Sequence, residues 1–359
     1  MKLLSASVDP FRRPLRRALT TSRGALHERE GLILTLYASS DECGAGEASP
    51  AYWIDDEQLD DTRAALERII RAVSDRPDTN DLRVLMLDRD AGLTPAAACA
   101  LDAALLELEA RARHMSVASL LGADQLSAIP VCALLAGDTP ASIASEAAQS
   151  IDAGYRCLKL KVGASDLEND VSRVREVRGI AGAQIAIRLD ANRAWPAAQA
   201  RDAMRRLDDF EIEFLEEPLQ HATPAALTEL RKYGKTPIAL DETIGSPEDL
   251  AKFAEGRAAG VVVLKAARLR GVTRAMRLGK IALEAGMQVV VTDSIESRVG
   301  MSAAVHLAAA VATPSCAIGL GGLSILAESV SPVPGATGSS WVRPTAGLEV
   351  SYVSKPSSP

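Results

Sequence analysis

The repeat of short apolar runs and amphipathic helical segments beyond residue 128 restricts the fold more than any other feature of this sequence. Alternation of this kind is typical of βα units, in which a helix follows each strand and covers a mostly parallel sheet. The helices expected between the strands include 141–153, 195–207, 247–254 and 272–285. The expected strands are 129–135, 157–162, 184–190, 211–216, 237–241, 260–265, 288–292 and 316–320.

Five successive strands of this set each end in a charged residue. The five are Lys161, Asp190, Glu216, Asp241 and Lys265, at intervals of 29, 26, 25 and 24 residues. One βα unit per interval, continued over about eight strands, predicts an α/β protein with a TIM-type barrel. A doubly wound open sheet is the competing architecture, but the sequence contains neither a G-x-G-x-x-G motif after the first strand nor a phosphate-binding loop.

The strand expected at 157–162 places two lysines on one face. Because side chains alternate along a strand, Lys159 and Lys161 lie opposite Leu158 and Leu160. Two ammonium groups on the inner face of a buried strand are costly unless anions lie close to them. The alternative is a solvated edge strand with its lysines turned outward, and this stretch alone leaves both interpretations open.

The carboxylates at three strand ends supply such anions. In a barrel the carboxyl ends of the strands line the active site, so Asp190, Glu216 and Asp241 would converge there. Three converging carboxylates repel each other unless a cation lies between them. An all-oxygen ligand set suits Mg²⁺, with Mn²⁺ as an alternative ion. The competing interpretation is that they are separate helix caps or loop carboxylates, but their shared spacing favours a metal site.

Lysines on both sides of such a metal suit the removal of a proton next to a substrate carboxylate. The enediolate dianion that forms needs stabilisation by the metal. The lysine base also needs a lowered pKa, which Lys159 and the metal would supply to Lys161. Other chemistries have less support, because the four histidines lack metal-ligand spacing and no G-x-S-x-G motif is present.

The first 110 residues do not follow the βα pattern. They contain a β-rich run at 31–37, a glycine-broken, turn-like stretch at 42–50 and helical spacing at 60–73. A further helix is expected to open at Thr94, which precedes a proline at the first helical position, and to end near residue 112. This mixture predicts a small α+β domain.

Composition limits the partners and the location of the protein. The net charge is −7 with no basic run, which argues against a nucleic-acid partner. No stretch has about eighteen consecutive apolar residues, so no membrane span is expected. The five cysteines are scattered, which suggests a reducing cytoplasm.

The charged strand ends lie within short motifs that follow each other in a recognisable order. They are 158–163 (LKLKVG), 188–195 (RLDANRAW), 215–218 (LEEP), 240–243 (LDET), 264–265 (LK) and 294–297 (SIES). This series resembles the enolase superfamily and, within it, the o-succinylbenzoate synthases of menaquinone biosynthesis, over nearly the whole chain. The resemblance implies an enolase-like (β/α)7β barrel at 116–324 and an α+β capping domain at 1–115, completed by the C-terminal segment at about 325–359.

The resemblance also implies a role for each strand-end residue. The three carboxylates would bind Mg²⁺, Lys161 would remove the proton, Lys265 would stabilise the enediolate and Lys159 would tune Lys161. Further residues implied to bind substrate or support the site are Arg188, Asn192, Glu242, Ser294 and Glu296. The small carboxylate substrate would be 2-succinyl-6-hydroxy-2,4-cyclohexadiene-1-carboxylate, dehydrated to 2-succinylbenzoate. A loop at 20–27 would cover the barrel mouth.

Some residues differ from the pattern of that family, and they touch the substrate rather than the metal. The differences are at Thr292-Asp293, Arg270 and Gly321-Gly322. The nearest alternative is therefore an N-succinylamino-acid racemase or dipeptide epimerase, which would use both lysines as bases. A non-catalytic barrel is a third reading, but it predicts the loss of a strand-end charge and none is missing. The oligomeric state stays open, with a homo-oligomer as one option.

Overall fold

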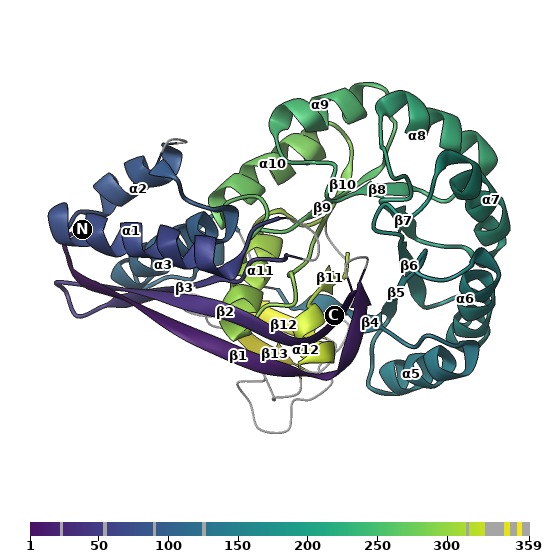
Figure 1. The fold of residues 1–359 in the computed structure, drawn as a ribbon, viewed down its shortest axis with the longest axis horizontal. Coiled ribbons are helices and arrows are strands. Elements are labelled where there is room, and N and C mark those ends of the chain that lie inside the picture. Colours follow the sequence, from purple (N-terminus) through teal and green to yellow (C-terminus); the bar gives the residue numbers. More distant parts are fainter. Residues whose placement is uncertain are drawn as a thin grey trace.

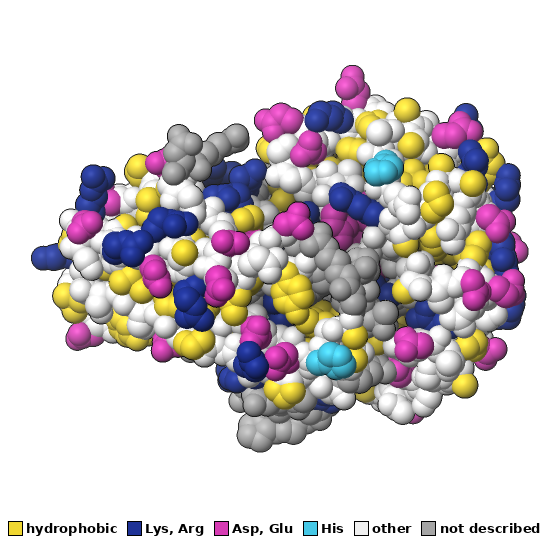
Figure 2. Space-filling model, in the orientation of Figure 1, with side chains coloured by type: hydrophobic (Ala, Val, Ile, Leu, Met, Phe, Trp, Pro, Cys, Tyr) yellow, Lys and Arg dark blue, Asp and Glu magenta, His cyan; other side chains and the backbone are white. Residues whose placement is uncertain are grey.

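The structure is a computed structural model that describes residues 1–21, 24–52, 56–88, 91–123, 127–313, 316–326, 341–344 and 350–353. A barrel of parallel strands ringed by helices lies beside a smaller domain of strands and helices, as Figure 1 shows. The face of the molecule drawn in Figure 2 carries Lys and Arg side chains interspersed with Asp and Glu, without a basic stripe.

The barrel is built from parallel strands that pair in chain order. They are β4 (Ile129–Leu135), β5 (Cys157–Lys161), β6 (Ala186–Asp190), β7 (Phe214–Glu216), β8 (Ile238–Leu240), β9 (Val261–Leu264), β10 (Gln288–Val291) and β11 (Ile318–Gly319). β11 pairs in parallel with β4, and a bridge between Thr292 and Gly319 joins it to the end of β10. These contacts nearly close the barrel, so the expected TIM-type architecture is confirmed.

Helices follow the strands and cover the outside of the barrel (Figure 1). They are α5 (Pro140–Asp152), α6 (Leu167–Ala181), α7 (Ala197–Leu207), α8 (Pro224–Leu230), α9 (Pro247–Glu255), α10 (Val272–Glu284) and α11 (Arg298–Val311). The strand and helix ranges expected here agree with the structure to within about three residues. The helix expected from residue 195 begins later, because Pro196 has an extended backbone and Trp195 bridges to Leu219.

Alternation along the strands separates two apolar layers. Leu158 and Leu160 of β5 are fully buried in the large core between the strands and the helices. Phe214, Val261 and Val290 belong to a smaller core cluster whose buried members are all strand residues, each one position away from an outward-facing residue of its own strand. The second cluster therefore fills the inside of the barrel, on the face that also carries the strand-end charges.

The smaller domain packs an antiparallel sheet against helices. Its elements are β1 (Leu3–Thr21), β2 (Gly24–Ala38), β3 (Cys43–Ala48), α1 (Leu59–Asp75), α2 (Thr79–Leu87) and α3 (Pro95–Ala112), followed by the short α4 (Val117–Leu120). The turn-like reading of 42–50 is wrong, since β3 occupies this stretch. Its Gly44 and Gly46 lie against the backbone of α3, where a Cβ would collide with the carbonyl oxygens of Ala104 and Ala100. The glycines therefore permit close packing of strand and helix.

Charged side chains of the smaller domain reach across to the barrel. Gly271 precedes α10 and cannot cap it with a side chain. Instead the buried Asp102 of α3 accepts hydrogen bonds from the backbone N of Thr273 at 2.8 Å and from its Oγ1 at 2.9 Å. The carboxylate of Asp102 in the smaller domain thus accepts the hydrogen bond of an otherwise unpaired backbone N–H in the first turn of α10, a helix of the barrel.

The hairpin of β1 and β2 extends from the smaller domain to the barrel (Figure 1). Leu19 and Leu26 near its tip share an apolar cluster with Leu134 at the end of β4 and Ile295 after β10. The tip therefore lies at the carboxyl ends of the barrel strands, where the loop at 20–27 was expected. Ser22 and Arg23 of that loop lie outside the described residues.

The C-terminal segment contacts both parts of the molecule. After α12 (Gly321–Ile325), Leu326 bridges to Leu15 of β1. β12 (Trp341–Pro344) pairs antiparallel with β4 of the barrel and with β13 (Val350–Val353). The expected boundaries between the capping domain and the barrel, at residues 115 and 324, stay a prediction.

Candidate active site

The five charged strand ends lie side by side at one end of the barrel. Lys161 of β5 pairs in register with Asp190 of β6, which pairs with Glu216 of β7. Asp241 and Lys265 directly follow β8 and β9, the next two strands. The three carboxylate residues have no solvent-exposed surface. The sequence thus folds three anions into a buried row, with a lysine at each end.

The two lysines of β5 face this row. Lys159 Nζ lies 2.8 Å from Asp190 Oδ2 and 2.6 Å from Glu216 Oε2. Lys161 Nζ lies 2.6 Å from the same Asp190 oxygen and donates at 2.6 Å to Asn192 Oδ1. β5 is an interior strand between β4 and β6. The reading of 157–162 as a solvated edge strand is therefore wrong.

Asp241, the carboxylate at the other end of the row, also forms ion pairs. Lys265 Nζ forms a buried ion pair with Asp241 Oδ2. Arg268, in the turn after β9, lies 3.2 Å from Asp241 Oδ1 and also bonds to the backbone oxygen of Glu242. Arg268 was missed in the sequence, where nothing distinguishes it from the exposed arginines around it.

Burial and charge shift the ionisation of these groups in opposite directions. Burial alone would lower the pKa of Lys159, but Asp190 and Glu216 outweigh it, so the pKa lies above its usual range. The pKa of Asp190 is held below its usual range despite burial, because Lys159, Lys161 and Lys265 surround it. Burial and the neighbouring Asp190 raise the pKa of Glu216 to about 8. The positive charge near Glu216 is therefore too small to offset burial and the repulsion from Asp190 when the Glu216 carboxyl group ionises.

The donor set fits a hard divalent cation. It consists of carboxylate oxygens only, and the buried Glu216 Oε1 has no hydrogen-bond partner among the described residues. As the described side chains stand, no three His, Cys, Asp or Glu residues are gathered to hold an ion. The ammonium group of Lys159 lies between Asp190 and Glu216 instead. An ion would thus take over the charge compensation that a lysine now provides.

Asn192 and Glu242 extend the row of charges. Asn192 Nδ2 donates to Glu242 Oε1 at 3.0 Å, while its Oδ1 accepts from Lys161. Burial and Asp241 raise the pKa of Glu242 to about 7. Asn192 has a left-handed backbone with φ of 42°, and asparagine is one of the residues that tolerates this conformation. The structure therefore brings both predicted residues to the site.

Arg188 lies apart from the carboxylates, deeper in the barrel. Its guanidinium bonds to Glu213 Oε2 and to the carbonyl oxygen of Ala317, each at 2.7 Å, and lies 4.8 Å from the centre of the Phe214 ring. Arg188 precedes Asp190 by two residues, so both face inward at different depths. The side chain occupies the barrel interior rather than the strand ends.

Ser294 and Glu296 lie in the loop between β10 and α11. Both are buried, and Glu296 Oε2 accepts a long hydrogen bond of 3.4 Å from the backbone N of Ser294. Burial and the nearby Glu47 and Asp293 raise the pKa of Glu296 to about 8. Gly300 makes room for this side chain, because a Cβ there would approach Glu296 Cβ to 2.6 Å.

The smaller domain fixes this loop through two buried charges. Arg29 of β2 donates to the backbone oxygens of Ile295 at 3.0 Å and Pro50 at 2.7 Å. Glu47 of β3 accepts from the backbone N of Ser297 and of Gly300, each at 3.0 Å, at the start of α11. Sequence reasoning missed both, because their partners lie 266 and 250 residues away along the chain.

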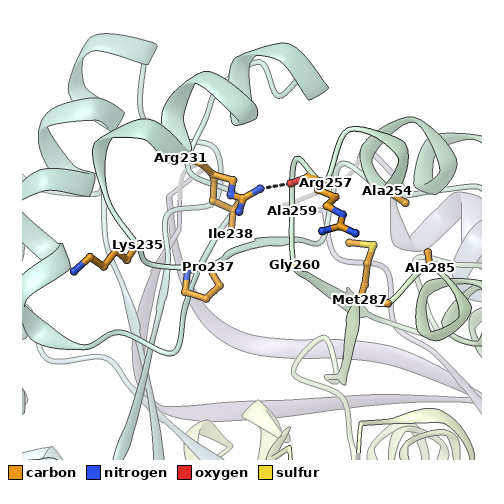
Figure 3. A pocket seen from close by; sticks show the side chains of 11 residues that line it. Arg231, Lys235, Pro237, Ile238, Ala254, Arg257, Ala259, Gly260, Ala285 and Met287 are labelled. Carbon is orange, nitrogen blue, oxygen red and sulfur yellow. Dashed lines mark hydrogen bonds between the residues drawn. The ribbon is translucent and has the colours of Figure 1, made fainter.

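A cavity of about 480 Å³ lies at the other end of the barrel strands. It opens between Pro237 and Ile238 at the start of β8, Gly260 before β9 and Met287 before β10. Figure 3 shows Arg231 directed at the backbone oxygen of Arg257 above this opening. The strand-end charges lie at the opposite ends of these strands, so the cavity is separate from the candidate site.

A family model described as "Enolase C-terminal domain-like" matches residues 142–334. The chain belongs to the enolase superfamily. The five charged strand ends described above lie within the matched residues. Among the described residues, no helix is both long and apolar enough to cross a membrane.

Curated relatives of this superfamily member have several activities. The L-Ala-D/L-Glu epimerase of Bacillus subtilis is 25% identical over 86% of this chain and 85% of its own. The N-succinyl-L-Arg/Lys racemase of Bacillus cereus is 27% identical over 86% of this chain and 84% of its own. The o-succinylbenzoate synthase of Thermobifida fusca is 38% identical, over 55% of this chain and 62% of its own.

Solved structures of the superfamily share the whole fold. The dipeptide epimerase of Enterococcus faecalis, complexed with Mg and the dipeptide L-Leu-L-Tyr, has a TM-score of 0.86 and 25% identity, and the match covers 98% of this chain and 100% of that one. The dipeptide epimerase of Cytophaga hutchinsonii, complexed with Mg and D-Ala-L-Val, also has a TM-score of 0.86, with 26% identity over 98% and 96% of the two chains.

Proposed function

We propose that this protein removes the proton next to the carboxylate of a small-molecule substrate, with Mg²⁺ held by Asp190, Glu216 and Asp241. The observation that carries the proposal is the row of three buried carboxylates with Lys161 at one end and Lys265 at the other. A bound Mg²⁺ would stabilise the negative charge that develops on the substrate carboxylate when the proton leaves. Mn²⁺ has the same ligand preference and is the second candidate ion.

The lysines would perform the proton transfer. Lys161 exposes 29% of its side chain, whereas Lys265 exposes 7% and Lys159 exposes 13%. The more exposed group is better placed to meet a substrate, so Lys161 would be the base. Lys265 would remain an ammonium ion, since its ion pair with Asp241 raises its pKa despite burial. It would then stabilise the dianion as a fixed charge.

We infer that the reaction is completed as a dehydration, with 2-succinyl-6-hydroxy-2,4-cyclohexadiene-1-carboxylate as substrate and 2-succinylbenzoate as product. Lys161 would take the proton next to the carboxylate and then give it to the hydroxyl group, which leaves as water. One base suffices when both groups leave from the same face. The unequal exposure of the two lysines and the 38% identity to an o-succinylbenzoate synthase support this choice.

Racemisation of an N-succinylamino acid or epimerisation of a dipeptide is the second candidate. It is favoured by the relatives that match over 86% of the chain, which are an epimerase and a racemase. Such a reaction removes the proton on one face and returns it on the other. A lysine at each end of the carboxylate row would supply both bases.

Substitution of each lysine by arginine separates the two candidates. Arginine keeps the charge but cannot act as a base near neutral pH. For a dehydratase, Lys161→Arg should lower the single-turnover dehydration rate by roughly 10²–10⁴-fold, while Lys265→Arg keeps partial activity. For a racemase, both substitutions should be comparably severe. Lys252→Arg on the exposed surface of α9 is the matched control and should leave the rate unchanged.

Solvent deuterium gives the second readout. Wild-type protein with Mg²⁺ should dehydrate the cyclohexadiene substrate within a single turnover. Rapid incorporation of deuterium into an N-succinylamino acid or a dipeptide, without dehydration, would transfer the assignment to the second candidate. Absence of both reactions in folded, Mg²⁺-loaded protein would refute the proposal as a whole. The proposal places the enzyme in the cytoplasm, in keeping with its five free thiols.

A further inference from the structure

Two cysteines lie against each other inside the barrel, below the charged strand ends. Cys132 of β4 and Cys157 of β5 are each 4% exposed and share a small buried cluster with Ala317. Their Sγ atoms are 3.1 Å apart, and the Cys157 thiol donates toward Cys132. Cys157 shares the inward face of β5 with Lys159 and Lys161. The pair therefore belongs to the barrel interior and takes no part in the proposed proton transfer.

The backbone already satisfies the requirements of a disulfide between these residues. Ala133 and Leu158 are register partners, so the two cysteines that precede them lie opposite each other on neighbouring parallel strands. Neighbouring strands lie about 4.8 Å apart, within the roughly 4.4–6.8 Å that disulfides allow between Cα atoms. Bond formation requires the Sγ atoms to approach from 3.1 Å to about 2.05 Å. Rotation about the side-chain bonds can supply a movement of this size.

The surroundings favour one thiolate in the pair. Burial opposes ionisation of Cys132, but the hydrogen bond from the Cys157 thiol and the charge of Arg188 bring the pKa of Cys132 below its usual value. Burial, followed by the neighbouring Cys132, raises the pKa of Cys157, so Cys157 keeps its proton until Cys132 has been oxidised. Thiolates, not thiols, are the nucleophiles in cysteine oxidation. The arrangement thus places the more acidic of the two thiols at contact distance from the other.

A partly exposed side chain lies next to the pair. Cys157 Sγ lies 3.9 Å from Glu213 Oε2, and Glu213 exposes 30% of its side chain. Cys99 of α3 is buried, and Cys43 is exposed on β3. The paired thiols can therefore be compared directly with a buried and an exposed thiol of the same chain.

We propose that Cys132 and Cys157 are a site of covalent modification, at which hydrogen peroxide converts the two thiols into a disulfide inside the barrel. The Cys132 sulfur attacks one peroxide oxygen, the O–O bond breaks, and one water leaves, giving a sulfenic acid. The Cys157 sulfur then attacks the Cys132 sulfur and displaces the hydroxyl group, which leaves as a second water with the Cys157 proton. Two thiols are oxidised and one peroxide is reduced to two waters.

Peptide mapping of the wild-type protein after graded peroxide treatment tests this proposal. The expected result is a cross-linked peptide pair joining Cys132 to Cys157, about 2 Da lighter than the two reduced peptides and lost on treatment with dithiothreitol. Oxidation of Cys43 in the same sample shows that the oxidant was active. Cys132 and Cys157 that both stay free thiols after Cys43 is fully oxidised would overturn the proposal.

Serine variants identify the partners. Cys157→Ser should abolish the cross-link, whereas Cys316→Ser, at the half-buried cysteine before β11, should leave its yield unchanged. A cross-link that joins Cys157 to Cys316 in the wild-type protein would also overturn the assignment. Circular dichroism of each variant before oxidation checks that it is folded, and the wild-type map decides the matter if a variant fails to fold.

Discussion

Replacement of Glu296 by glutamine is expected to stabilise the protein in alkaline solution and to leave its stability in acid almost unchanged. Burial and the charges of Glu47 and Asp293 raise the pKa of Glu296 from 4.5 to about 8, with Arg29 as the opposing charge. The native state therefore keeps a proton that the unfolded chain releases. The contribution of this protonated carboxyl group to the free energy of unfolding is fully present below the pKa of Glu296 in the unfolded chain. It is lost as the pH rises toward the pKa of Glu296 in the folded protein.

The size of this effect follows from the same pKa. A difference of one pH unit corresponds to about 1.4 kcal/mol, so ionised Glu296 costs the native state up to about 5 kcal/mol above pH 8. Glutamine has nearly the same shape, can still accept from the backbone N of Ser294, and can donate to the neighbouring carboxylates. The variant should thus unfold at a higher urea concentration than the wild type at about pH 9, and at a similar one at about pH 4.5.

Urea unfolding of both proteins across this range, at constant ionic strength, measures the difference. Glu284→Gln, at an exposed glutamate of α10, is the control and should follow the wild-type curve. Parallel pH profiles for Glu296→Gln and the wild type would refute the reasoning, because they would mean that Glu296 ionises alike in the folded and unfolded chains.

Three further outcomes are expected. Chelation should abolish the proposed proton transfer and added Mg²⁺ should restore it, so full turnover by metal-stripped protein would contradict the metal site. Asp102→Ala removes the acceptor at the start of α10 and should lower the free energy of unfolding by about 1–2 kcal/mol in urea titrations; an unchanged midpoint would show that this cap is dispensable. Gly46→Ala should strongly destabilise the protein, because the new Cβ would collide with the α3 backbone. Gly179→Ala in α6, where a Cβ has no atom within 4 Å, should instead raise the free energy of unfolding by roughly 0.4–1 kcal/mol in the same titrations. Equal effects of the two alanines would argue against close packing of β3 on α3.

The barrel could be predicted because its information is local and repeated. Each βα unit carries its own apolar run, helix and strand-end charge, so Asp190, Glu216 and Asp241 mark the same position in three successive units. Parallel pairing in chain order then brings them together. β3 was misread for a related reason: its glycines look like a turn locally, and only the backbone of α3, about 55 residues away, explains them.

Depth inside the barrel was the feature that local patterns could not supply. Arg188 and Asp190 share a face and a motif, yet one bonds to Glu213 and Ala317 and the other to the lysines of β5. Alternation gives the face of a residue but not the layer of the barrel that it reaches. Lys159 and Arg188 are register partners two positions before their strand ends, yet the Lys159 side chain reaches up to the carboxylates and that of Arg188 does not.

The loop after β10 shows why the smaller domain matters for the site. Ile295 in this loop is in a left-handed conformation with φ of 59°, which costs energy in a β-branched residue. The carbonyl of Ile295 is held by Arg29, and the turn that follows is held by Glu47. Both side chains are buried, so loss of either would leave its partner groups unsatisfied in an apolar environment. The conformation of this loop at the barrel mouth is therefore held from two sides, by Asp293 on Gly321 and Gly322 and by the docked smaller domain. A substitution in β2 or β3 can thus alter the site without touching any strand-end residue.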